Sequence, residues 1–220
     1  SADGSRLVLH APGRDAVGID VDTAGQRREV KLFGTDYRGI DQGHVVAGWL
    51  SETLGVGSRL GRVPPEHDRK TDGHTPGTSA YADSCAVHLV SEASLAELNR
   101  RLTAKGSAPV PMERFRPNIV VSGHHEPHEE DRLRLLRIGT AELGYAKLAV
   151  RCVVTTVDQD SGAKSGPEPL RTLAEYRRAP EGGVVFGSKF AVTGTGTLAV
   201  GDTLTVDEWG PSEAKRHPRA

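Results

Sequence analysis

The chain has 220 residues, which is enough for one large domain or for a barrel domain with a small appendage. Hydrophobic residues make up 36% and charged residues 26%, as is typical of soluble globular proteins. The formal net charge of −1 indicates neither a nucleic acid nor an anionic membrane as a partner. There is no apolar run of about 18 residues and no secretory signal, so the expected location is cytoplasmic.

The cysteine count argues against a disulfide-stabilised fold. The chain has two cysteines, Cys85 and Cys152, which are too few for the framework of a small secreted protein. The more common arrangement is one buried thiol and one incidental thiol, and their spacing gives no support to a disulfide between them. The only methionine is Met112, so we expect that the printed start was processed, trimmed or engineered.

Short apolar runs, with 26 glycines and 13 prolines, predict many strands joined by turns. In chain order, strands are predicted at residues 6–10, 28–33, 58–63, 86–90, 118–122, 134–138, 142–148, 152–157, 184–192 and 203–206. Residues 64–80 are polar and match no element, which predicts a functional or mobile loop. The segment after Trp209 is predicted to be disordered.

Three segments carry the apolar spacing of helices. The first, Gln42–Leu54, is predicted to bury one face made of Val45, Val46, Trp49, Leu50 and Leu54. The second, Ser91–Lys105, has an N-cap candidate at Ser91 and a terminating Gly106. The third is the short Leu170–Arg178. Together the elements predict a mostly antiparallel β-barrel or mixed sheet with a few helices on its outside.

The segment Arg151–Asp158 is the first candidate for chemistry. A guanidinium beside a thiol favours the thiolate, which is the form that attacks electrophiles or binds a metal, so Arg151 would activate Cys152. Soft thiolate ligands suit molybdenum in its enzymatic oxidation states. By itself this is a weak signal, because a buried strand cysteine is the more common case by roughly three to one.

Two further segments carry polar candidates. Arg116 precedes a proline, which predicts an extended backbone, and its planar guanidinium suits a phosphate or a polar heterocycle. Asn118 then opens the next predicted strand. Asp83 and Ser84 lie in a predicted turn, where they could bond a polar ring or simply shape the turn. A surface ion pair is the more common role for an isolated Arg116.

The histidine-rich stretch at residues 124–131 is a rival metal site. It contains His124, His125, His128, Glu126, Glu129, Glu130 and Asp131. Such ligands could hold zinc or nickel, but neighbouring histidines alternate in direction and no ordered ligand spacing emerges. A solvated loop is therefore the favoured interpretation of this stretch.

The ordered set of motifs resembles the MOSC family, in particular the branch of the amidoxime-reducing component and its bacterial relatives. The match extends from about Ser79 to Val206, and more weakly from about Arg28. Its segments are Ser91–Leu95, Arg116–Val120, Glu130–Asp131, Leu136–Gly139, Arg151–Asp158, Glu168–Arg177, Phe186–Gly187 and Val200–Asp202.

The resemblance implies a mostly β fold with flanking helices (α+β), of the MOSC β-barrel type. It implies a molybdenum cofactor (molybdopterin) whose metal is bound by Cys152, the candidate catalytic residue. The residues that would hold the cofactor are Arg151, Arg116, Asn118, Asp83, Ser84 and Thr155. The implied activity is the reduction of small N-hydroxylated molecules with electrons from a donor protein, independent of pyridoxal phosphate. The expected organisation is a partial N-terminal region at 1–78, a MOSC core at 79–207 and a disordered tail at 208–220.

This chain departs from the pattern of the family at several positions. Relatives carry a Lys-Ser pair and a downstream arginine that help to hold the cofactor, and no such pair lies near the start of this chain. Early strands of the barrel would then be missing, and a companion chain could supply them. Val150 and Cys85 each stand where close relatives often have a serine.

Two alternatives to a molybdenum reductase stay open. The protein could be a non-catalytic subunit that carries the cofactor, or a sulfur atom on Cys152, for another protein. It could also be a MOSC scaffold that catalyses a cofactor-free reaction in a specialised pathway, with Cys152 as the nucleophile.

Overall fold

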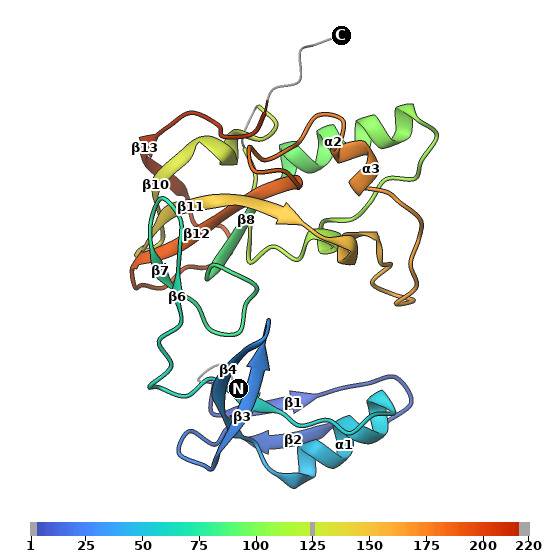
Figure 1. The fold of residues 1–220 in the computed structure, drawn as a ribbon, viewed down its shortest axis with the longest axis vertical. Helices are drawn as coiled ribbons and strands as arrows, with labels where there is room; N and C mark the ends of the chain where they lie inside the picture. The colour runs from blue at the N-terminus through green and yellow to red at the C-terminus, as the bar shows by residue number, and fades with distance from the viewer. Residues whose placement is uncertain (1–3, 124–125, 216–220) are drawn as a thin grey trace. The chain divides into compact units, whose positions relative to one another are not determined.

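The computed structural model describes residues 4–123 and 126–215. The chain divides into two compact units, residues 1–69 and 70–220, which are described separately (Figure 1). The domain boundary that the sequence predicts between residues 78 and 79 stays a prediction.

The first unit is built from two small antiparallel sheets and one helix. Strand β1 pairs with β2, and β4 lies between β3 and β5. The elements are β1 (Arg6–Leu9), β2 (Val17–Asp20), β3 (Arg27–Leu32), β4 (Thr35–Asp41), α1 (His44–Leu54) and β5 (Gly61–Arg62). Strands β2 and β4 were not predicted, because neither contains a run of apolar residues and each becomes a strand by pairing with the strand before it.

Helix α1 confirms the first predicted helix but not its predicted apolar face. It ends at Gly55, whose left-handed φ of 68° suits glycine. Val46 is fully buried, whereas Val45 is 71% exposed and Leu54 61% exposed. The predicted burial of Val45 and Leu54 is therefore wrong, and the buried stripe of α1 is narrower than the apolar pattern suggested.

The second unit is organised around a six-stranded sheet in the order β13-β10-β11-β12-β8-β9, which curls into a half-barrel (Figure 1). Neighbouring strands are antiparallel except β8 and β9, which are parallel. The strands are β8 (Val87–Ser91), β9 (Ile119–Val121), β10 (Leu133–Ile138), β11 (Ala141–Arg151), β12 (Val184–Gly194) and β13 (Leu204–Trp209). Each confirms a predicted strand to within a few residues, and the fold is mostly β with three helices, as expected.

Helix α2 (Glu92–Ala104) follows β8 directly because Ser91 caps it. The Ser91 Oγ accepts a 3.1 Å hydrogen bond from the Ser94 backbone N–H, which satisfies a free donor of the first turn. Helix α3 is shorter than predicted, spanning Leu170–Leu173, and the chain to Arg178 forms turns and an isolated bridge. Three 3-10 helices complete the unit: η1 (Met112–Phe115), η2 (Glu129–Arg132) and η3 (Val153–Thr156).

Apolar clusters lie on both faces of the sheet. Successive residues of a strand point to opposite faces, so Leu89 and Val90 of β8 enter different clusters. One cluster contains Leu89, Leu136, Leu143, Tyr145 and Phe190. The other joins α2 and α3 to the sheet through Val90, Leu98, Leu102, Leu173 and Phe186. The sheet is therefore a rigid support for the residues at its strand ends.

The segment predicted as a strand at 152–157 is instead the 3-10 helix η3, which begins where β11 ends. The Thr155 and Thr156 hydroxyls donate hydrogen bonds of 3.0 and 2.7 Å to the carbonyls of Cys152 and Val153, three residues earlier. These local bonds compete with strand pairing and outweigh the β propensity of the β-branched side chains. Cys152 consequently lies at a change of chain direction.

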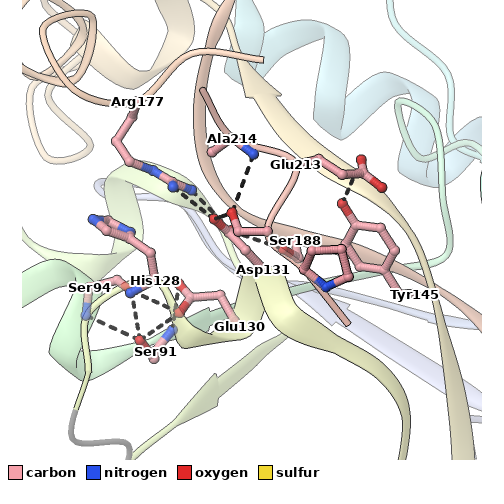
Figure 2. A network of polar contacts seen from close by, with 12 residues as sticks. Ser91, Ser94, His128, Glu130, Asp131, Tyr145, Arg177, Ser188, Glu213 and Ala214 are labelled. Carbon is pink, nitrogen blue, oxygen red and sulfur yellow. Dashed lines mark hydrogen bonds and ion pairs between the residues drawn. The ribbon is translucent and has the colours of Figure 1, made fainter. Parts of the chain in front are cut away.

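A buried polar network at residues 128–131 contradicts the interpretation of this part of the histidine-rich stretch as a solvated loop, whereas Glu126 is exposed (Figure 2). Glu130 and Asp131 are both fully buried. Glu130 accepts hydrogen bonds from the hydroxyls of Ser91 (2.9 Å) and Ser94 (2.8 Å). His128 is half-buried, and its ring packs against that of Tyr176, with the two ring centroids 5.6 Å apart. His124 and His125 lie outside the described residues.

The polar loop predicted at 64–80 contains the short hairpin of β6 (Lys70–Thr71) and β7 (Gly77–Thr78).

After β13, Ser212 donates a 3.0 Å hydrogen bond to Asp131, and Glu213 accepts one of 3.1 Å from the Tyr145 hydroxyl. Within the described part of the chain, no helix is long and apolar enough to cross a membrane.

Candidate functional site

The two cysteines differ in accessibility. Cys152, which follows the last residue of β11, is exposed, whereas Cys85 is 6% exposed, and both are free thiols. The common alternative of a buried strand cysteine therefore does not apply to Cys152. The hydrogen bond from Thr155 to the Cys152 carbonyl fixes the backbone at the thiol.

Arg151 brings several predicted site residues into one electrostatic environment. Burial lowers the pKa of its guanidinium, the charges of Cys152 and Asp83 raise it, and that of Arg116 lowers it. Its Nη2 donates a 2.8 Å hydrogen bond to the Phe115 carbonyl. Its Nε is buried and has no hydrogen-bond partner among the described residues. A buried donor of a cation that lacks a partner is costly unless a ligand satisfies it.

Arg116 and Asn118 lie in the connection that leads into β9. Arg116 is exposed and has a left-handed backbone with φ 50° and ψ 51°, so the prediction of an extended residue before proline is wrong. The preceding turn of η1 sets this conformation. The Asn118 Oδ1 accepts a 2.8 Å hydrogen bond from the His88 backbone N–H, and its own N–H donates to the His88 carbonyl. Asn118 thus holds β8 and β9 together.

Asp83 and Ser84 lie in the bend before β8, as predicted. The Ser84 Oγ accepts a 2.6 Å hydrogen bond from the Lys189 Nζ. Thr155 is 1% exposed and contacts the Cys152 backbone. Asp83, Arg116 and Cys152 therefore lie close enough for their charges to act on Arg151, while the side chains of Thr155 and Asn118 bond to backbone.

Two further residues of this region, His88 and Lys189, were not predicted and are direct cross-strand neighbours. His88 has its pKa lowered to about 4, mainly by burial and then by the charge of Arg151. Burial also lowers the pKa of Lys189, while the nearby Cys85 and Asp83 raise it. A lysine inside the otherwise apolar strand pattern of 184–192 was the available signal.

Comparison with known proteins decides the family. The MOSC domain profile matches residues 76–205, more than half of the chain. This chain belongs to the MOSC domain family. Mitochondrial amidoxime reducing component 2 of Rattus norvegicus is 39% identical over 220 residues, which cover 90% of this chain and 62% of the relative. The corresponding component 1 of Homo sapiens is 34% identical over 221 residues, covering 93% and 64%.

The resemblance to the amidoxime-reducing branch of the family is thereby confirmed. Component 2 of Homo sapiens is 32% identical over 214 residues, which cover 90% of this chain and 62% of that protein. This chain thus spans between three fifths and two thirds of the length of these relatives.

The rival metal site of the sequence analysis has no counterpart in the described part of this MOSC protein. No three His, Cys, Asp or Glu side chains of residues 4–123 and 126–215 gather as metal ligands. Glu130 bonds to two serines, and Asp131 forms an ion pair with Arg177 at 2.7 Å. Two of the four carboxylates of the predicted cluster, Glu130 and Asp131, are therefore occupied by protein partners.

A cavity of about 960 Å³ lies between the two edge strands of the sheet, β9 and β13. Its wall includes Ile119, Val121, Leu204 and Trp209, and Asn118 is the one predicted site residue that lines it. This cavity is separate from the surroundings of the Cys152 thiol.

Proposed function

We propose that this MOSC protein binds the molybdenum cofactor through the Cys152 thiolate and reduces N-hydroxylated substrates with electrons from a partner protein. The observation that carries the proposal is the exposed Cys152 beside Arg151, whose buried guanidinium lacks a carboxylate within ion-pair distance among the described residues. The names of the relatives, amidoxime reducing components, supply the substrate class.

The residues around Cys152 fit an anionic group. Arg151 and Arg116 provide two permanent cations, and the unpaired Nε of Arg151 offers a donor in a fixed, planar arrangement. Arg151, Arg116 and Ser84 would hold the pterin and its phosphate, with Asp83 accepting from ring N–H groups. Thr155 and Asn118 would act through the backbone they fix, since their side-chain oxygens bond to the chain itself.

The proposed reaction breaks the N–O bond, takes up two electrons and two protons, and yields an N–H group and water. The cofactor, when bound, would supply the oxygen-atom and electron chemistry. The protein's part is to orient the thiolate through Thr155, to neutralise negative charge through both arginines and to exclude bulk water around the half-buried Arg151.

A separate electron donor is part of the proposal. The sequence has no iron–sulfur spacing, no flavin fingerprint and no haem motif. We therefore propose a donor protein as the partner. The companion chain and the cytoplasmic location stay predictions; the relatives carry the word mitochondrial in their names.

The test is the reduction of benzamidoxime to benzamidine by protein purified from a cofactor-producing host, with reduced methyl viologen as the electron source. Wild type and the control Cys85→Ser should both form benzamidine, whereas Cys152→Ser should form none. Arg151→Met should lose most of the activity because an uncharged side chain cannot hold an anionic group. Full activity of Cys152→Ser would contradict the proposal.

The same experiment separates the two alternatives. Molybdenum bound at Cys152 without turnover under any donor would favour a cofactor carrier. Activity of molybdenum-free protein that is lost on thiol alkylation would favour cofactor-free chemistry with Cys152 as the nucleophile.

A further inference from the structure

Lys189 is the central residue of a basic row that crosses the sheet. It lies on β12, and its direct cross-strand partners are Lys147 on β11 and His88 on β8. Directly paired residues place their side chains on the same face of a sheet. This is the face covered by the bend that contains Ser84 and Cys85, because Lys189 reaches Ser84 from it. Phe190, the next residue, points into the apolar cluster on the opposite face.

The ammonium group of Lys189 is half-buried and has no carboxylate within ion-pair distance in the described part of the chain. Its hydrogen bond is to the neutral hydroxyl of Ser84, at 2.6 Å. An ammonium group has three N–H donors, so two remain for another acceptor. Removing a charge from water without pairing it costs free energy, and a bound anion would recover that cost.

Among the charged residues around it, Lys189 is the cation that is available to bind an anion other than the cofactor. Lys147 forms an ion pair with Asp72, at 2.6 Å. His88 has its pKa lowered to about 4 by burial and is therefore neutral near pH 7. The charge of Arg151 lowers the pKa of Lys189, but Arg151 interacts electrostatically with Cys152 as well. Asp83 and Cys85 act on Lys189 from the bend before β8.

We infer that Lys189 is a specificity-determining residue that binds an anionic oxygen of the substrate. This inference rests on the proposed function and names the substrate class more closely. The protein would prefer N-hydroxylated compounds that carry a carboxylate or another anionic oxygen over uncharged compounds with the same N–O group. Lys189 acts on substrate binding, whereas Arg151 and Arg116 serve the cofactor.

The test compares two binding probes that need no turnover, benzoate and its neutral analogue benzamide, by isothermal titration calorimetry. The protein is used as purified, and molybdenum per chain is measured in the same samples. The variants are Lys189→Met, which removes the charge at similar length, and Lys189→Arg, which keeps it. Lys147→Met is the matched control, because it removes the neighbouring lysine that already has Asp72 as its partner.

Wild type and Lys147→Met should bind benzoate about tenfold more tightly than Lys189→Met does, as expected for a charged hydrogen bond. Benzamide binding should be equal in all variants, and Lys189→Arg should restore most of the benzoate affinity. In turnover, Lys189→Met should raise KM for 4-carboxybenzamidoxime about tenfold, and the ratio of kcat/KM for 4-carboxybenzamidoxime to that for benzamidoxime should fall by about the same factor, whereas Lys147→Met should leave this ratio unchanged.

Three results would overturn the inference. Equal benzoate binding by wild type and Lys189→Met would show that Lys189 binds no anion. Loss of molybdenum in Lys189→Met would make Lys189 a cofactor-binding residue instead. A wild type that retains molybdenum but binds no benzoate would reject the anion site while leaving the role of Cys152 intact. Conversely, protein without molybdenum or turnover that still shows the Lys189-dependent benzoate binding would reject only the proposed function.

Discussion

Arg177 and Asp131 form a two-armed ion pair in the interior of the second unit. The Nη1–Oδ2 distance is 2.7 Å and the Nη2–Oδ1 distance is 2.9 Å, with 5% and 0% of the two side chains exposed (Figure 2). Ser188 and Ser212 also donate hydrogen bonds to Asp131. Together these bonds join the chain after α3 to η2, directly before β10, and to the segment that follows β13.

Replacing Arg177 by Met should lower the free energy of unfolding by about 3–5 kcal/mol, because the substitution leaves the buried Asp131 carboxylate without its counter-ion. The measurement is urea-induced unfolding followed by far-UV circular dichroism. Arg137→Met is the control, since Arg137 makes a similar two-armed pair with Asp207 at the surface and should show little change. Equal losses in the two variants would show that burial does not set the strength of this pair.

Gly187 and Gly201 are two positions at which the effect of the same substitution, glycine to alanine, can be compared. Both have positive φ, 76° and 97°. A Cβ at Gly187 would lie 2.6 Å from the His88 Nε2 and 2.7 Å from the Leu89 carbonyl oxygen, whereas nothing lies within 4 Å at Gly201. Gly187→Ala should therefore lose about 1–3 kcal/mol more stability than Gly201→Ala, through overpacking added to the shared backbone strain. Equal melting temperatures for the two variants would contradict this contact.

His88 should make the fold sensitive to acid. Its folded-state pKa of about 4 lies below the unfolded value near 6.5, so between these pH values the unfolded state binds more protons. Stability should be complete above about pH 6.5 and fall by about 2–3 kcal/mol as the pH drops toward 4. Chemical unfolding at pH 7.5 and 4.5 measures this loss, which His88→Gln should reduce. An unchanged pH dependence in His88→Gln would mean that His88 is not the titrating group.

The two thiols should react at different rates in molybdenum-free protein. Cys152 is exposed and Cys85 is 6% exposed, so a disulfide reagent such as DTNB should modify Cys152 faster by at least about tenfold. The fast phase should disappear in Cys152→Ser and persist in Cys85→Ser. Retention of the fast phase in Cys152→Ser would place the accessible thiol at Cys85.

Much of the second unit could be predicted from the sequence, because its signals are local. Ser91 with the leucine spacing after it specifies α2, and short apolar runs between turn residues specify β10, β11 and β12. The family resemblance predicts Cys152, Arg151, Arg116 and Asp83 as site residues, and the charges of the other three all act on Arg151.

The remaining features depend on contacts between distant segments. The burial of Glu130 and Asp131 follows from partners on β8, α2 and the chain after α3, which no local pattern reveals. The 3-10 turn at Cys152 depends on threonine hydroxyls that outweigh strand propensity. Lys189 and Ser84 are 105 residues apart in the chain, so their contact could be predicted only with the strand register known.

Molybdenum binding by Cys152 can be measured by elemental mass spectrometry of protein from a cofactor-producing host. We expect close to one molybdenum per chain in wild type and in Cys85→Ser, and none in Cys152→Ser. Circular dichroism should show the same fold in all three, since Cys152 is exposed and contributes little to packing. Molybdenum retained by a folded Cys152→Ser variant would contradict the account.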